Sequence, residues 1–121
     1  MSIPPAYPLQ LAAWRTLQRI RGVGIVYHVT TTKSLDIERA VLTQPRANRI
    51  DGDIGLAMRQ WQWLIDPEDL SINEEQLIPA EGHWIMHGTT RYKLTPGEGN
   101  NLVWRWSDAM HIWRRVFVEE V

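Results

Sequence analysis

Two histidines are the first candidates for chemistry in this sequence. His83 and His87 stand four residues apart, a spacing that on a helix joins two ligands on one metal ion. Gly82 and Gly88 bound the segment and its residues favour β structure, so we expect a strand rather than a helix. Because four residues of a strand span about 13 Å, the two imidazoles would lie too far apart for one ion. The sequence therefore predicts no metal site here.

Carboxylates are the second candidates. Asp51-Gly52-Asp53 has the start of a calcium-binding loop, but the further ligands and the terminal glutamate are missing. A downstream acidic group could supply paired carboxylates for acid–base catalysis; its members are Asp66, Glu68, Asp69, Glu74, Glu75 and Glu81. Nothing apolar surrounds most of them to raise a pKa, and no histidine or hydroxyl stands at a telling spacing. We therefore expect these carboxylates to be solvated.

Two further kinds of site are excluded by what the sequence lacks. There is no cysteine, which rules out disulfides, thiolate catalysis and thiolate zinc sites. The segment 97–101 is not followed by the Lys-Ser/Thr pair of a phosphate-binding loop. We therefore predict that the protein is not an enzyme and uses no cofactor.

Tryptophan alternating with arginine near the C-terminus is the third candidate. In the segments 102–106 and 112–118, Trp104, Trp106 and Trp113 are interleaved with arginines, which could form a stacking platform for single-stranded nucleic acid. The same alternation fits the wall of a small barrel. The formal net charge is −1, from 13 basic and 14 acidic residues, whereas a dedicated nucleic-acid binder is normally basic. An OB- or SH3-like nucleic-acid-binding module remains an alternative.

The helix and strands that would position these residues can be read from hydrophobic periodicity. Leu9 to Arg21 is predicted to be an amphipathic helix that ends at Gly22. Its apolar face holds Tyr7, Leu11, Trp14 and Leu17 with Ala13 and Ile20 beside them, and its polar face holds Arg15, Gln18 and Arg19. Predicted strands cover 25–31, 37–43, 56–65, both sides of Gly88-Thr89-Thr90 between 84 and 94, 102–106 and 112–118.

These elements predict a mainly β fold, a small antiparallel β-barrel or sandwich with one N-terminal amphipathic helix and a long loop. At 121 residues we expect one domain over 9–121, preceded by an extended arm over 1–8. In the second strand, Ile37 and Val41 are expected on the face opposite Ala40. The strand at 56–65 is apolar on both faces, which indicates a central strand or one that meets another subunit.

Two segments stand out as candidates for contacts with partners. The loop 44–54 is the most polar stretch between predicted strands, and its candidate residues are Arg46, Asn48, Arg49, Asp51 and Asp53. Seven tryptophans are unusual for this length, and tryptophan is enriched at protein interfaces. The candidate subunit-interface residues are Trp61, Trp63, Arg114 and Arg115. No stretch approaches the length of a membrane span, so we expect no membrane partner.

One succession of short motifs resembles a known family. In order, the chain has Trp-x-Ile, Asp-x-x-Asp-Leu, Ile-Pro-x-x-Gly-x-x-Ile, Gly-x-x-x-Tyr-x-Leu and Trp-x-Trp-x-Asp, followed by a strand that runs to the C-terminus. The residues that carry it are Trp63, Ile65, Asp66, Asp69, Leu70, Ile78, Pro79, Gly82, Ile85, Gly88, Tyr92, Leu94, Trp104, Trp106, Asp108 and 112–118. This order resembles the head-closure proteins of tailed bacteriophages, also called stopper or head–tail connector proteins. Many members have Gly-Asp where this chain has Gly82-His83.

The resemblance implies a structural virion protein of the neck, made in the cytoplasm of the host bacterium. Such proteins form a homo-oligomeric ring that closes the DNA-filled capsid and offers the tail a docking surface. The implied partners are a portal or adaptor ring on the head side, a tail terminator or tail tube on the other, and non-specifically held double-stranded DNA in the channel. The polar loop 44–54 would then face the channel or the next ring. Another neck ring, an adaptor or a tail terminator, is the alternative within the virion.

Overall fold

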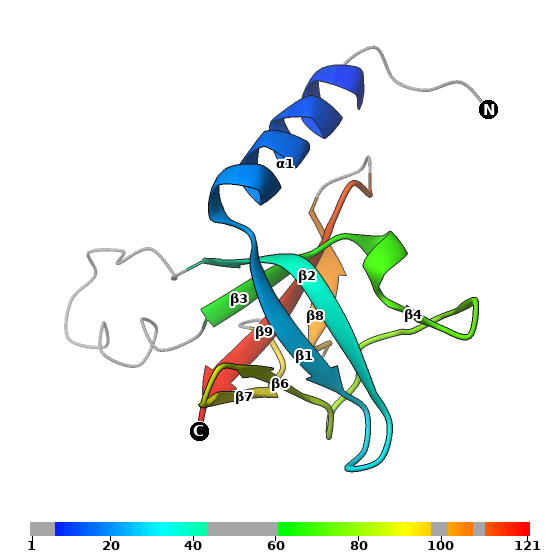
Figure 1. Ribbon diagram of the computed structural model, residues 1–121, viewed down its shortest axis with the longest axis vertical. Helices are drawn as coiled ribbons and strands as arrows, with labels where there is room; N and C mark the ends of the chain where they lie inside the picture. Colours follow the sequence, from blue (N-terminus) through cyan, green and yellow to red (C-terminus); the bar gives the residue numbers. More distant parts are fainter. Residues whose placement is uncertain (1–6, 44–60, 98–101, 108–110) are drawn as a thin grey trace, which may run out of the picture.

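The fold is a closed six-stranded antiparallel β-barrel that carries one N-terminal helix (Figure 1). The computed structural model describes residues 7–43, 61–97, 102–107 and 111–121. The elements are α1 (Tyr7–Arg21), β1 (Val23–His28), β2 (Ser34–Thr43), β3 (Trp61–Ile65), the 3₁₀ turn η1 (Pro67–Asp69), β4 (Ser71–Ile72), β5 (Glu75–Gln76), β6 (Trp84–His87), β7 (Thr90–Leu94), β8 (Trp104–Trp106) and β9 (Arg114–Glu120). The predicted fold class is confirmed, and the barrel replaces the open choice between barrel and sandwich.

Strand β9 closes the barrel. The strand order is β3-β2-β1-β6-β7-β9, and β9 pairs back onto β3 from Trp61 opposite Val118 to Ile65 opposite Arg114. The other edge of β9 is shared, because β7 pairs with its last residues and the extra strand β8 with its first. Closure gives each of the six barrel strands a paired neighbour on both sides, which limits pairing with other chains.

The barrel interior is filled by side chains that alternate along each strand. Ile25 and Tyr27 of β1 and Trp63 and Ile65 of β3 all point into the main core, and each is at most 3% exposed. Leu64 lies on the opposite face of β3, in a second apolar cluster beneath α1. The two-sided apolarity of this strand therefore reflects a core on one side and the helix on the other.

A bulge in β2 changes which side chains share a face. Val23 pairs with Ala40, but Ile25 pairs with Ile37, so β2 carries one extra residue between the two pairs. As a result Ile37 and Ala40 both face the main core, while Val41 faces the cluster beneath the helix. The predicted sharing of a face by Ile37 and Val41 is therefore wrong, because strict alternation does not hold across a bulge.

Helix α1 rests on the barrel through its inner face. Leu11, Trp14 and Leu17 belong to the second cluster, whose other buried members are Val41, Leu64 and Ile112. The rings of Trp14 and Trp113 stack with centroids 4.9 Å apart. The helix begins at Tyr7, two residues before the predicted start, and residues 1–6 of the predicted arm lie outside the described residues. No helix of the described ranges is long and apolar enough to cross a membrane.

Two helix residues take places opposite to those predicted. Ile20 is 72% exposed, whereas Gln18 is buried and donates a hydrogen bond from Nε2 to the Arg39 carbonyl oxygen at 3.3 Å. The last turn of α1 lies so close to β2 that a Cβ added at Gly22 would meet the Gln18 carbonyl oxygen at 2.3 Å and Arg39 Cβ at 3.1 Å. Glycine is needed at the end of this helix for that close approach.

The turns divide into predicted and unpredicted ones. The β6–β7 hairpin is confirmed, with Gly88 at a φ of 62°. A second hairpin, β4–β5, was not predicted, because its turn places Asn73 and Glu74 at positive φ without a glycine.

Two strand limits also differ from the predicted ones. β1 ends at His28, where the Thr30 hydroxyl accepts a hydrogen bond from the Lys33 N–H at 3.1 Å, and β9 begins at Arg114 rather than Ile112.

Candidate functional site

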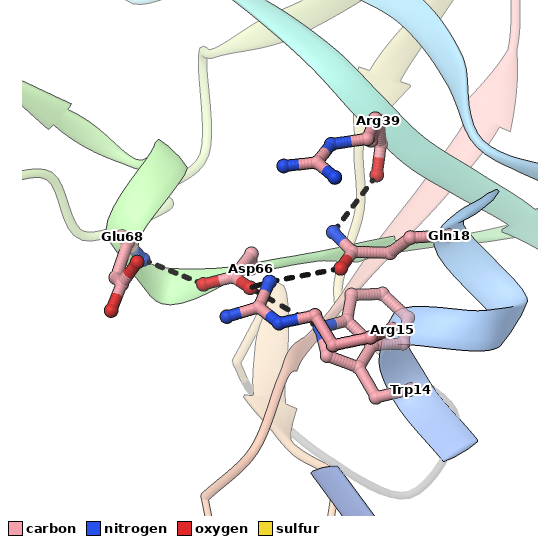
Figure 2. A network of polar contacts seen from close by, with 6 residues as sticks. All are labelled: Trp14, Arg15, Gln18, Arg39, Asp66 and Glu68. Carbon is pink, nitrogen blue, oxygen red and sulfur yellow. Dashed lines mark hydrogen bonds and ion pairs between the residues drawn. The ribbon is translucent and has the colours of Figure 1, made fainter. Parts of the chain in front are cut away.

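Asp66 is the centre of a polar network between the helix and the barrel (Figure 2). It follows β3 directly and is 5% exposed. Its Oδ2 accepts hydrogen bonds from Trp14 Nε1 at 3.3 Å and from the Arg15 guanidinium at 2.6 Å, and the latter contact is also an ion pair. Arg15 donates in addition to Gln18 Oε1 at 3.0 Å. One carboxylate thus joins the middle of α1 to the end of β3.

The second oxygen of Asp66 orders the segment that follows. Its Oδ1 accepts a hydrogen bond from the Glu68 N–H at 3.0 Å, which caps η1, and Pro67 occupies the first position of that turn. The predicted solvation of Asp66 is therefore wrong. Glu68, Glu74, Glu75 and Glu81 are exposed, as predicted. Asp69 is half-buried, and burial and the charge of Asp66 raise its pKa, while Arg39 and Arg15 partly offset the increase.

Arg114 forms an internal cage with two tryptophans. Its side chain is 2% exposed, and its guanidinium carbon lies 4.5 Å from the ring centroid of Trp104 and 5.0 Å from that of Trp106. The guanidinium donates to the Leu77 carbonyl oxygen at 3.0 Å, and the ring of His111 stacks on Trp106 at 4.5 Å. The cage therefore ties β8 and β9 to the segment after the β4–β5 hairpin.

The same cage bears on the nucleic-acid alternative. A base would need to stack on an accessible tryptophan face. The Arg114 guanidinium already lies against both tryptophan rings of β8, and the His111 ring stacks on Trp106. Trp84 of β6 is likewise engaged, with His28 stacked at 4.9 Å and the Arg91 guanidinium 4.9 Å from its centroid. These contacts favour tryptophan as a structural residue rather than as a platform for bases.

Tyr27 and His83 form a partly buried contact just before β6. The Tyr27 hydroxyl lies 2.6 Å from His83 Nδ1, and the Ala80 N–H donates to the same nitrogen at 3.3 Å. A nitrogen that accepts from Ala80 carries no proton, so Tyr27 is the donor and the imidazole is neutral. Burial lowers the pKa of His83 and raises the pKa of Tyr27, an effect that the charge of Arg114 partly offsets. The contact fixes the turn that opens the β6–β7 hairpin.

This geometry predicts a pH-dependent stability. Folding lowers the pKa of His83, so near the ordinary pKa of about 6.5 the imidazole binds a proton more readily in the unfolded chain than in the folded one. The free energy of unfolding therefore falls as the pH drops below about 6.5. Urea unfolding at pH 8 and pH 5 should show a smaller loss for His83→Gln than for the unmodified chain. His87→Gln, at a position whose ring contacts Trp63 edge-on, is the matched control. Equal losses in all three proteins would contradict the prediction.

The predicted interface residues have different environments. Trp63 is fully buried in the main core and Arg114 is buried in its cage, so neither side chain is available to a neighbouring subunit. This corrects the interface prediction for these two residues. Trp61 and Arg115 are half-buried, and Arg115 donates to Gln62 Oε1 at 3.0 Å across the β3–β9 pair. The predicted loop residues Arg46, Asn48, Arg49, Asp51 and Asp53 lie outside the described residues.

The two histidines of the rejected metal site have separate environments. His83 contacts Tyr27, whereas His87 lies edge-on to Trp63 with ring centroids 5.6 Å apart. Within the described ranges no group of three or more His, Asp or Glu side chains could hold a metal ion. Sequence reasoning missed the roles of Asp66, Gln18 and Tyr27. Of these three roles, only that of Asp66 could have been predicted from the sequence, because an aspartate directly before a proline is typical of a helical N-cap.

Comparison with known proteins gives one match. A protein-family model described as phage head-tail joining protein matches residues 9–121. The match includes α1 from Leu9 onward and every strand of the barrel, together with the Asp66 network and the Arg114 cage. No curated protein and no solved structure matches the chain.

Proposed function

The chain belongs to the phage head-tail joining protein family, and from this premise we propose that its copies form a ring that closes the DNA-filled capsid and receives the tail. The family is a structural one, and its place is the interface between head and tail. The observation that carries the proposal is the family match over residues 9–121, which covers the whole described fold except the first two residues of α1.

The mechanism of the ring would be steric and electrostatic. Identical subunits that meet through heterologous contacts close into a ring when the successive rotations from one subunit to the next add up to a full turn. A closed barrel, with its helix fixed by Asp66 and its β8 strand fixed by Arg114, is a rigid building block for such a ring. In this arrangement the barrel supplies the wall, and segments that project from it supply the contacts.

The polar loop 44–54 would supply the contact with DNA or with the next ring. Its arginines, Arg46 and Arg49, would hold the phosphate backbone without reading sequence, and such contacts weaken with salt. On the head side the ring would meet a portal or adaptor ring, and on the other side a tail terminator or tail tube. The protein would be made in the host cytoplasm and work in the neck of the virion.

An adaptor or tail-terminator ring is the second candidate for the same family. The two candidates differ in what the protein does to a filled head. A closure protein retains packaged DNA before any tail is present, whereas a tail terminator binds tails first. A free nucleic-acid-binding module is disfavoured by the occupied tryptophan faces in β6 and β8.

The experiment uses DNA-filled heads from a phage that lacks this protein. Purified protein is added, and the heads are tested for nuclease-resistant DNA, for joining to purified tails, and for new density at the vertex by electron microscopy. The proposal predicts a ring at the vertex, protected DNA and restored joining. Protein that binds tails but leaves head DNA unprotected would support the tail-terminator candidate instead. Protein that binds neither structure would overturn both candidates.

A further inference from the structure

Helix α1 has an outer apolar face that the barrel does not cover. Leu9, Ala13, Thr16 and Ile20 follow the helical spacing i, i+4, i+7, i+11 and are all exposed. We call these four residues the outer helix face. Leu9 is 76% exposed and Ile20 is 72% exposed, although both are large aliphatic side chains. The face lies opposite the one that packs on the barrel through Trp14.

Helix α1 and the segment 61–82 have opposite charge. From Tyr7 to Gly22 the chain has three arginines and no acidic residue, and from 61 to 82 it has six carboxylates and no basic residue. One arginine and one carboxylate, Arg15 and Asp66, pair within the chain. Among the described residues no ion pair involves the remaining arginines of the helix, Arg19 and Arg21.

The acidic partner surface lies on and after the β4–β5 hairpin. Glu74, Glu75, Ile78 and Glu81 are exposed, and we call these four residues the hairpin face. Ile78 is 52% exposed, and the part of the chain that the structure describes shows no ion pair at the three glutamates. The hairpin is well anchored, because the Leu77 N–H donates to the Leu70 carbonyl oxygen at 2.8 Å and Arg114 donates to the Leu77 carbonyl oxygen. A fixed surface loses little entropy on binding.

We propose that the outer helix face of one subunit docks on the hairpin face of the next copy. Figure 1 shows that α1 and the β4–β5 hairpin project from the barrel in different directions. The two faces of one chain therefore serve two different neighbours, which is the heterologous contact that a ring requires. Ile20 meets Ile78 at the centre, and Arg19 meets Glu74 or Glu75 at the rim, the usual composition of a protein interface. The proposal rests on the ring of the proposed function.

Cysteine cross-linking tests the contact directly, because the chain has no cysteine of its own. The variant Ile20→Cys/Ile78→Cys is assembled on DNA-filled heads and oxidised mildly. Non-reducing gels should show a ladder of covalent multimers that reductant removes. Either cysteine alone should leave the protein monomeric on the gel, since a heterologous contact does not bring identical residues together. Ile20→Cys/Val121→Cys is the matched control, because Val121 is 74% exposed but lies outside the hairpin face.

The same particles separate the failure of this contact from the failure of the proposed function. A ring at the vertex without a ladder overturns the contact and leaves the proposed function standing. If the unmodified protein forms no ring on DNA-filled heads, the proposed function is overturned. Cross-links from Ile78→Cys or Ile20→Cys to a protein of the portal or tail also overturn the proposal, because they assign the face to another partner.

Charge reversal gives a second, independent readout. Arg19→Glu alone, or Glu74→Lys/Glu75→Lys alone, should each lower the yield of joined particles by about tenfold, as loss of an interfacial ion pair predicts. Combining the reversals should restore the yield, because the opposite charges meet again. The three sites are exposed, so circular dichroism should show an unchanged fold. A combined variant as poor as the single reversals would overturn the proposal.

Discussion

Replacing Arg114 with alanine is expected to lower the free energy of unfolding by about 4 kcal/mol, the size typical of emptying a large buried site. The side chain is 2% exposed and its guanidinium packs against the rings of both Trp104 and Trp106. Alanine would leave a cavity beside the two rings and an unpaired carbonyl oxygen at Leu77. Urea unfolding followed by tryptophan fluorescence measures the effect, because both tryptophans report on the cage.

The contribution of the charge can be separated from that of the volume. Burial lowers the pKa of Arg114, which reflects the cost of removing its charge from water. Arg114→Met fills the same space without a charge and should recover more than half of the lost stability, as replacement of buried charges by apolar residues often does. Arg105→Ala, at an exposed position of β8, is the control and should change the free energy of unfolding by less than about 0.5 kcal/mol. A methionine variant as unstable as the alanine variant would contradict a packing role.

Replacing Asp66 with alanine is expected to cost about 3 kcal/mol, because three donors lose their acceptor at once. The indole N–H of Trp14 would remain buried and unpaired, and η1 would lose its cap at the Glu68 N–H. The Arg15 ion pair adds less, because the arginine side chain is 43% exposed and its charge is screened by water. Urea unfolding at pH 7 measures the cost.

Asp66→Asn and Glu68→Ala are the matched variants. Asparagine keeps an acceptor for Trp14 or for the cap, so it should lose only about half as much stability as alanine. Glu68→Ala removes a neighbouring carboxylate that is exposed, and it should change the free energy of unfolding by less than about 0.5 kcal/mol. If Asp66→Ala were no more costly than Glu68→Ala, the network in Figure 2 would not be what holds the helix on the barrel.

Both sites matter for the proposed ring, although both residues are buried within the subunit. Asp66 fixes the direction of α1, and Arg114 fixes the segment that follows the β4–β5 hairpin. The outer helix face and the hairpin face are therefore held at a fixed angle by the interior of the same subunit. In a ring that angle decides whether successive contacts close. Variants at Asp66 and Arg114 that remain folded should thus weaken assembly, even though their side chains are buried.

The local elements and the family could be recognised from the amino-acid sequence alone. Hydrophobic periodicity located the helix, the alternation of Ile25 and Tyr27 placed β1, and Gly88 marked the β6–β7 turn, because these features depend on neighbours in the chain. The order of short motifs indicated the head–tail family, and the family match bears this out. The mainly β class followed from the same local patterns.

Which residues are buried, and by which neighbours, depends on contacts between distant parts of the chain. The pairing of β3 with β9 joins segments about 50 residues apart, and it buries Trp63, which the sequence assigned equally well to an interface. The helix brings Arg15 and Trp14 onto Asp66, and the two tryptophans of β8 pack against Arg114. A sequence pattern reports the polarity of each face, but burial and partners arise from long-range contacts, which no local spacing contains.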